Sequence, residues 1–271
     1  MPANGAVPHT LRYSLNCSLI FTELPVNERP AAARAAGFEA VEFWWPFDSP
    51  VPRGAEVDAF VTAISDAGVY LSGLNFFSGQ MPGPDRGVLS HPAREREFRD
   101  NVAVVVDIAR RTGTKAFNAL YGLRQTDVDS EEQDRVALRN ILAAAEGVGA
   151  IDGTVLIEAV SGAADYPLKT AKDALAVVAS AHAAGAPNVA FLADFFHLAM
   201  NGDDLNAVVR QHAGEFGHVQ IADVPGRGEP GTGKLPLDAL LSDTRSGGYD
   251  GFVGLEYSPT TPSSPNFDWR H

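Results

Sequence analysis

The sequence predicts a (β/α)8 barrel, and three observations support this fold class. Seven times, a glycine ends an alanine-rich, helix-like stretch and a short run of β-branched and aromatic residues follows. An eighth such run lies near the N-terminus, and eight strands alternating with helices in about 260 residues are typical of a closed parallel barrel. The first strand is not followed by a G-x-G-x-x-G segment, which argues against a doubly wound sheet.

The expected strands begin shortly after these glycines, because glycine readily adopts the left-handed conformation that closes a helix. The runs are too short for helices and rich in strand-forming residues. They cover residues 11–18, 38–43, 69–71, 115–118, 154–158, 189–194, 218–221 and 252–256. Between them, Ser90 is expected to cap one helix and Ser130 to open the next. Few residues remain after the eighth strand, so the last helix of the barrel is predicted to be short or absent.

We expect one domain over residues 11–271, preceded by a flexible tail over residues 1–10. The tail lacks the apolar core of a signal peptide, and no apolar run approaches the ~20 residues of a membrane span. The single cysteine, Cys17, fits a reducing compartment and is expected to be a buried apolar side chain. These features predict a cytoplasmic protein, and they are compatible with a homo-oligomer.

The chain is acidic, with a formal net charge of −13 and a pI near 4.9. Such a surface repels phosphate backbones and anionic lipids, so neither a nucleic acid nor a membrane is an expected partner. A small-molecule substrate is expected instead. If that substrate is an anion, the site must supply positive charge locally, from a metal ion or an arginine.

Side chains that offer oxygen atoms lie on four consecutive predicted strands. The fifth, sixth and eighth strands end at Glu158, Asp194 and Glu256, and the seventh carries Gln220. In a barrel, the carboxyl ends of the strands all face one site. Three carboxylates in a partly dry site repel one another, and a divalent cation relieves that repulsion. Because all four donors are oxygens, we expect one Mg²⁺ or Mn²⁺ ion rather than zinc.

Several of these side chains also have a simpler interpretation, which the sequence leaves open. Asp194 could cap the turn that follows it. His197 either begins the next helix or donates a hydrogen bond to a substrate above the metal. Arg227, in a Gly/Pro-rich loop, is either solvated or binds a carboxylate through two hydrogen bonds. His218 shares a strand face with Gln220, and we expect it to belong to the core.

At these positions the chain resembles the hydroxypyruvate isomerase family, one of the xylose isomerase-like barrels. The resemblance covers residues 11–259 in order. Its most specific segments are H-V-Q-I-A-D at 218–223 and R-G-E-P-G-T-G at 227–233. Weaker matches are V-E-F at 41–43, R-E-R-E-F-R-D at 94–100, L-I-E at 156–158, D-F-F-H at 194–197 and G-L-E-Y at 254–257.

The resemblance implies a role for each candidate residue. The implied metal ligands are Glu158, Asp194, Gln220 and Glu256. The two glutamates would also move the proton, and His197 and Arg227 would hold the substrate. Related ketose 3-epimerases usually have histidine where this chain has Gln220, which favours the isomerase branch.

Two stretches depart from the family pattern. The family often reads E-P-x-N after the glutamate of the fifth strand, whereas this chain reads E-A-V-S at 158–161 and G-A-A-D at 162–165. Leu74 also stands where relatives often have histidine. Because the first stretch borders the substrate, it leaves the identity of the substrate open.

The expected reaction interconverts hydroxypyruvate and tartronate semialdehyde (2-hydroxy-3-oxopropanoate) through a shared ene-diolate. The metal would stabilise the developing negative charge, and the glutamates would transfer the proton between adjacent carbons. No nicotinamide or flavin is required. The nearest alternatives are a ketose 3-epimerase and a 2-oxo-tetronate isomerase on the same barrel. More distant ones are an AP-endonuclease-like DNA repair enzyme, which would need several zinc ions and a basic face, and a non-catalytic binding barrel.

Overall fold

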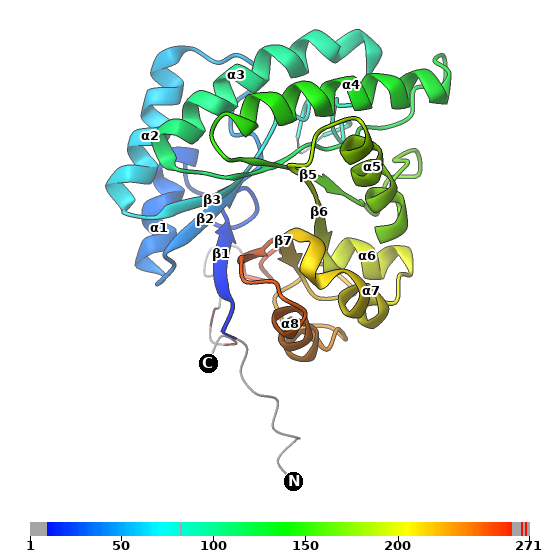
Figure 1. Cartoon of the computed structure of the whole chain (residues 1–271). Coiled ribbons are helices and arrows are strands. Elements are labelled where there is room, and N and C mark those ends of the chain that lie inside the picture. The colour runs from blue at the N-terminus through cyan, green and yellow to red at the C-terminus, as the bar shows by residue number, and fades with distance from the viewer. Residues whose placement is uncertain (1–9, 82, 262–266, 268, 270–271) are drawn as a thin grey trace.

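The computed structural model describes residues 10–81, 83–261, 267 and 269. Eight parallel strands follow one another in chain order around a closed barrel, and the last strand pairs with the first (Figure 1). The predicted (β/α)8 fold is therefore confirmed. The tail expected over residues 1–10 lies, except for Thr10, outside the described residues.

The strands lie close to their predicted positions. They are β1 (Arg12–Asn16), β2 (Ala40–Phe43), β3 (Tyr70–Asn75), β4 (Ala116–Asn118), β5 (Thr154–Glu158), β6 (Val189–Asp194), β7 (Phe216–Ile221) and β8 (Phe252–Leu255). The largest difference is in β3, which extends beyond its predicted end at Leu71. Its last residues, Leu74 and Asn75, pair with Phe117 and Asn118 of the neighbouring strand, so the ladder continues to the mouth of the barrel.

Helices surround the barrel (Figure 1). They are α1 (Arg29–Ala35), α2 (Gly54–Ala67), α3 (Glu95–Thr112), α4 (Ser130–Gly149), α5 (Ala171–Ala183), α6 (Phe195–Asn201), α7 (Leu205–His212) and α8 (Leu237–Ser246), with short 3-10 turns at Val26–Glu28, Pro92–Arg94 and Ala213–Glu215. The stretch directly after β8, residues 256–261, contains no helix. None of the helices in the described ranges has the length and apolar character that crossing a membrane requires.

The expected helix ends are only partly correct. Gly68 and Gly113 close α2 and α3 in the left-handed conformation, with φ of 63° and 79°. The expected cap at Ser90 is wrong, because α3 begins at Glu95 after a 3-10 turn and Arg94 occupies its N-cap position. The start of α4 at Ser130 is confirmed.

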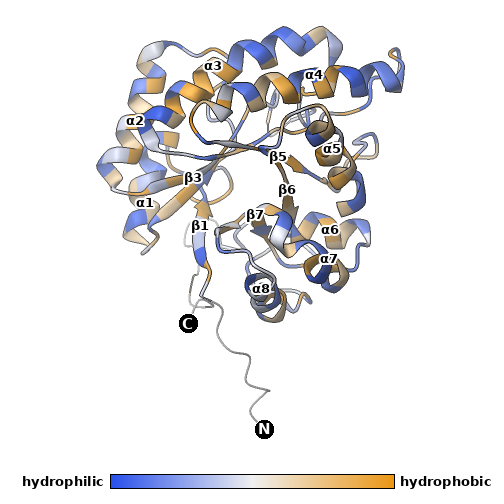
Figure 2. Cartoon of the chain, viewed as in Figure 1, coloured by the Kyte–Doolittle hydropathy of each residue, from blue (hydrophilic) through white to orange (hydrophobic). Residues whose placement is uncertain are grey.

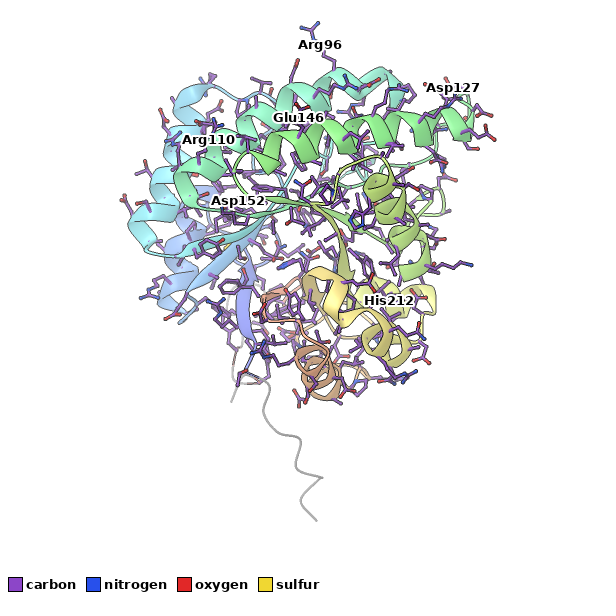
Figure 3. The ribbon with its side chains drawn as sticks, in the orientation of Figure 1. Arg96, Arg110, Asp127, Glu146, Asp152 and His212 are labelled. Carbon is purple, nitrogen blue, oxygen red and sulfur yellow. The ribbon has the colours of Figure 1, made fainter. Side chains whose placement is uncertain are left out.

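The core has an apolar shell and a polar centre. Apolar side chains lie between the strands and the inner faces of the helices, whereas charged side chains such as Arg96 and Asp127 point outward (Figures 2 and 3). Cys17 is buried as expected, and burial raises its thiol pKa, so the thiol stays protonated. Inside the barrel, Glu42 is 2% exposed beside Gly254. A Cβ at that glycine would lie 2.5 Å from Glu42 Oε2, so the missing side chain makes room for the buried carboxylate.

Candidate active site

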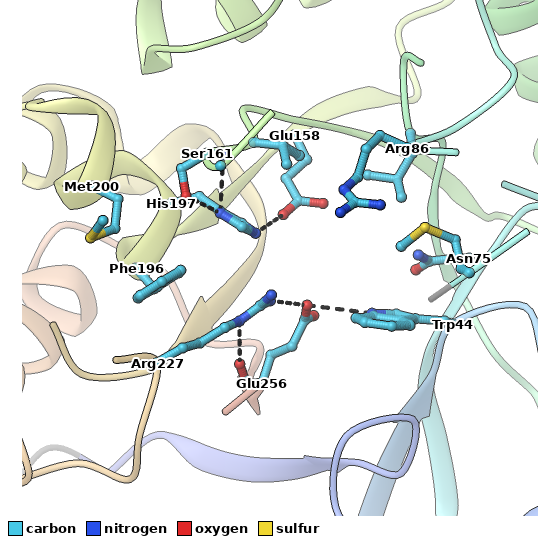
Figure 4. Close-up of a pocket in the computed structure, with 14 residues that line it drawn as sticks. Trp44, Asn75, Arg86, Glu158, Ser161, Phe196, His197, Met200, Arg227 and Glu256 are labelled. Atoms are coloured by element: carbon cyan, nitrogen blue, oxygen red, sulfur yellow. Dashed lines mark hydrogen bonds and ion pairs between the residues drawn. The ribbon is translucent and has the colours of Figure 1, made fainter. Parts of the chain in front are cut away.

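The four expected ligand residues lie at the carboxyl-terminal mouth of the barrel, and all are at most 5% exposed. β5, β6 and β7 carry Glu158, Asp194 and Gln220, and Glu256 directly follows β8. A cavity of about 330 Å³ opens at this mouth, and Glu158 and Glu256 are the two of the four that line it (Figure 4). Its lining residues are Trp44, Asn75, Met81, Arg86, Leu120, Glu158, Val160, Ser161, Gly162, Phe196, His197, Met200, Arg227 and Glu256.

One cluster joins the ends of β5 and β6. Glu158, Asp194 and His197 each offer a ligand atom, and these atoms all lie within 4.8 Å of one another. Asp194 Oδ1 accepts the His197 backbone N–H at 3.1 Å and so caps α6, while Oδ2 is buried without a hydrogen-bond partner. Asp194 can therefore cap α6 with Oδ1 and still offer Oδ2 as a ligand atom.

The ring of His197 has a defined orientation. The Ser161 backbone N–H donates to Nδ1 at 3.1 Å, so the neutral ring carries its proton on Nε2. Nε2 lies 3.8 Å from both Glu158 Oε1 and Asp194 Oδ2. Burial lowers the pKa of His197 to about 4, which outweighs the opposing effect of the Asp194 carboxylate. At neutral pH His197 is therefore a neutral hydrogen-bond donor beside the two carboxylates.

A second cluster surrounds Glu256. Its Oε1 accepts from Arg227 Nη2 at 2.5 Å and from Trp44 Nε1 at 3.3 Å, and its Oε2 accepts from Asn16 Nδ2 at 3.2 Å. The same Arg227 nitrogen lies 3.9 Å from Asp194 Oδ2, so the guanidinium connects the two carboxylates. Its positive charge partly offsets their repulsion.

Gln220 belongs to a polar network that continues into the barrel. Its Nε2 donates to Glu42 Oε1 at 2.7 Å, and its own Oε1 is buried without a partner. Glu42 also accepts from Asn16 Nδ2 at 3.0 Å, and its Oε2 lies 2.7 Å from His218 Nε2. The expected place of His218 in the core is therefore confirmed, and Glu42 fixes which end of the Gln220 amide is left without a partner.

Asp223 organises the loop that carries Arg227. Its carboxylate accepts four backbone N–H groups at 2.8–3.0 Å, those of Val224, Gly231, Gly233 and Leu235. Arg227 itself has a φ of 58°, an unusual conformation for a residue with a side chain. The H-V-Q-I-A-D and R-G-E-P-G-T-G segments thus form one unit, in which the first holds the second in place.

The carboxyl groups of the site strongly influence one another. Burial raises the pKa of Glu158 well above its usual value, and the charges of Glu256 and Asp194 raise it further. Burial also raises the pKa of Glu256, although the nearby Arg227 opposes the shift. A bound cation would relieve this unfavourable concentration of negative charge.

The donor set fits a hard divalent cation. Three buried oxygens on strands of the barrel have no hydrogen-bond partner: Asn118 Oδ1 on β4, Asp194 Oδ2 on β6 and Gln220 Oε1 on β7. Buried polar atoms are normally paired, so oxygens without partners at one mouth are consistent with a ligand site. Carboxylate and amide oxygens are the donors that Mg²⁺ and Mn²⁺ prefer.

Sequence reasoning missed several residues of the site. Asn118 Nδ2 donates to Glu158 Oε2 at 2.7 Å, and its position at the end of a predicted strand was a usable signal. Arg86 lies in a Gly/Pro-rich loop at the mouth, the same signal that drew attention to Arg227. The parts played by Asn16 and Trp44 depend on contacts over more than 200 residues, which no local pattern reveals.

A closed parallel barrel with buried acids at its carboxyl-terminal mouth is typical of TIM-barrel enzymes. The comparisons with known proteins agree with this class. The family model described as xylose isomerase-like TIM barrel matches residues 30–271, and the chain belongs to that family. The resemblance to hydroxypyruvate isomerases is also confirmed, and the chain is an isomerase. A Streptomyces coelicolor protein provisionally named a hydroxypyruvate isomerase is 54% identical over 95% of this chain and 95% of its own length.

Other relatives show the range of functions within this family. Hydroxypyruvate isomerase from Escherichia coli is 31% identical over 96% of this chain and 98% of its own length. A 2-oxo-tetronate isomerase from Cupriavidus necator is 30% identical over 95% of this chain and 96% of its own length. A solved structure described as an AP endonuclease, family 2, from Brucella melitensis has a TM-score of 0.86 and 30% identity, covering 96% of this chain and 98% of that chain.

Proposed function

We propose that this isomerase interconverts hydroxypyruvate and tartronate semialdehyde, with one Mg²⁺ or Mn²⁺ ion. The observation that carries the proposal is the arrangement of the mouth. Two buried glutamates, Glu158 and Glu256, line one small cavity, and unpartnered oxygens of Asp194 and Gln220 lie at the ends of the strands between them. The names of the similar relatives support the choice of substrate.

The proposed metal ligands are Glu158, Asp194, Gln220 and Glu256. When bound, the ion would supply positive charge that polarises the carbonyl group of the substrate. Glu42 supports this arrangement by binding the Gln220 amide nitrogen, which leaves the amide oxygen free to act as a ligand.

The two glutamates are the proposed acid and base. The reaction removes a proton from C3 of hydroxypyruvate and returns one to C2, so a carboxylate must reach both carbons. Glu158 Oε2 is held by Asn118 at 2.7 Å, whereas the contact of Oε1 with His197 Nε2 is longer, at 3.8 Å (Figure 4). Glu256 is held by Trp44 and Arg227 on one oxygen. Glu158 therefore offers the less encumbered oxygen, and we assign it the first proton transfer.

His197 and Arg227 are the proposed substrate contacts. His197 presents Nε2–H beside Glu158 and Asp194, where it would donate to a substrate oxygen. Arg227 lies over the face of Phe196, with Cζ 5.3 Å from the ring centre, and this contact restricts the guanidinium to one side of the cavity. Both groups would stabilise the negative charge that develops on the substrate.

A 2-oxo-tetronate isomerase is the second candidate, favoured by the similarity to the Cupriavidus necator enzyme. It would use the same residues on a substrate with one more carbon. Two observations argue against an AP-endonuclease function. The net charge of −13 would repel DNA, and the described lining of the cavity contains one histidine, His197, where a site for several zinc ions would need more.

The test is an isomerase assay of the Mg²⁺- or Mn²⁺-supplemented protein on hydroxypyruvate, a 2-oxo-tetronate and free ketoses. We expect the highest kcat/KM on hydroxypyruvate. Glu158→Gln and Glu256→Gln should each lose at least about 100-fold in kcat while remaining folded. Near-normal turnover in both variants would reject the proposed acid and base, and preference for a ketose would reject the substrate.

A further inference from the structure

Arg86 is a second arginine in the lining of the cavity, and the proposed reaction leaves it without a function. It lies in the loop between β3 and α3. Figure 4 shows its side chain reaching into the cavity from the side opposite Arg227. The cavity of this acidic protein therefore has a guanidinium on each of two sides.

The two arginines differ in how much of their charge is available. Arg227 is already paired with Glu256 at 2.5 Å. Arg86 has no carboxylate partner among the described side chains. Its Nη1 donates to the backbone oxygens of Gly83 at 2.5 Å and Asp85 at 2.8 Å, while Nε and Nη2 have no described acceptor. The guanidinium is thus held from one side and offers two further donors.

The loop around Arg86 is firmly attached to the barrel. The next residue, Gly87, has a φ of 109° and donates its N–H to Ser78 O at 3.0 Å. A Cβ at this glycine would lie 2.1 Å from Leu120 O, so only glycine permits such a close approach of the loop to the segment that follows β4. On the other side, Asp85 Oδ2 accepts from Arg94 Nη1 at 2.9 Å. Arg86 therefore starts from a fixed backbone position.

We propose that Arg86 binds the carboxylate of the substrate, and that the site selects small 2-oxo and 2-hydroxy acids over neutral ketoses. This inference rests on the proposed function, because it assigns the end of the substrate that the reaction does not change. A planar guanidinium with two donors free matches a carboxylate through two parallel hydrogen bonds. Arg227, which is paired with Glu256, would lie beside the reacting end of the substrate instead of binding its carboxylate.

The first test compares an acid with a neutral substrate of similar shape. Dihydroxyacetone has a hydroxymethyl group where hydroxypyruvate has its carboxylate. Arg86→Met should raise KM for hydroxypyruvate by at least about 30-fold, change kcat much less, and leave kcat/KM for dihydroxyacetone within about threefold. Arg86→Lys, which keeps the charge, should recover part of the loss. The matched control is Arg96→Met, at an exposed arginine of α3 far from the cavity (Figure 3).

The second test measures binding without turnover. Calorimetric titration of the metal-supplemented protein with D-glycerate, an inert 2-hydroxy acid, should give a Kd at least about 30-fold weaker for Arg86→Met than for wild type or Arg96→Met. Equal affinity in the folded Arg86→Met variant would overturn the inference, as would a wild-type protein that turns over hydroxypyruvate but does not bind D-glycerate. Binding that depends on Arg86, without isomerase activity, would reject the proposed reaction and retain the carboxylate site.

Discussion

The carboxylate of Asp223 holds the loop that carries Arg227, and Asp223→Asn tests this arrangement. Four backbone N–H groups donate to the two oxygens of Asp223. Asparagine keeps one oxygen and places an NH₂ group against two of these donors. Losing two hydrogen bonds to a charged group costs roughly 1.5–3 kcal/mol each. Water can reach part of the exposed loop, so we expect a loss of about 2–4 kcal/mol in the free energy of unfolding.

The pH dependence of this effect has a defined sign. Burial alone would raise the pKa of Asp223, but the backbone donors outweigh burial and lower it. The stabilisation is therefore complete above the unfolded pKa of about 3.9 and is lost as the pH falls through the lower, folded value. The difference in stability between wild type and Asp223→Asn should accordingly be constant near neutral pH and shrink below about pH 4.

The assay is urea unfolding of both proteins across this pH range, combined with steady-state kinetics at neutral pH. Asp250→Asn, at an exposed aspartate with no described hydrogen bond, is the matched control and should change stability by less than about 0.5 kcal/mol. Because the loop positions Arg227, Asp223→Asn should also lower kcat/KM at least about tenfold. Unchanged stability and kinetics in Asp223→Asn would refute the reasoning that this carboxylate organises the loop.

Three further predictions follow from the same contacts. Glu158 has a raised folded pKa, so its ionisation costs stability as the pH rises above about 4.5. The metal-free Glu158→Gln variant should therefore be more stable than metal-free wild type at pH 8, by about 1–3 kcal/mol, and equally stable near pH 4. Thermal unfolding that shows the variant to be less stable at pH 8 would contradict this prediction. Gly254→Ala would place a Cβ 2.5 Å from Glu42 Oε2 and should cost about 1–3 kcal/mol in chemical denaturation, and a neutral effect would disprove the tight packing. Treatment with a chelator should abolish isomerase activity and added Mg²⁺ or Mn²⁺ should restore it, whereas full activity of the chelated protein would exclude the metal.

The fold was predictable because the barrel repeats one local rule. Each helix closes near a glycine such as Gly68, and a strand follows soon after, so the pattern is visible without any long-range information. The end of β3 was not visible in this way. Leu74 and Asn75 extend the strand because they pair with β4, a contact that is set by closure of the barrel.

The sequence predicted those residues of the candidate site whose place at the end of a strand is enough to bring them to the mouth of the barrel. Glu158 and Asp194 terminate strands, so the barrel brings them to one mouth whatever the loops do. Arg86 was overlooked because its effect depends on where its loop attaches, and that attachment is a backbone contact between Gly87 and residues 120–121, just after β4. The partners of Gln220 were also hidden, since Glu42 reaches it across the interior of the barrel.

The most direct test of the central claim is a crystal structure of the protein soaked with Mn²⁺, with the ion located by its anomalous scattering. We predict one ion about 2 Å from oxygens of Glu158, Asp194, Gln220 and Glu256. Forming this site would require Glu256 to exchange part of its contact with Arg227 for the ion. An ion bound elsewhere, or a mouth that binds no Mn²⁺ at millimolar concentration, would contradict the account.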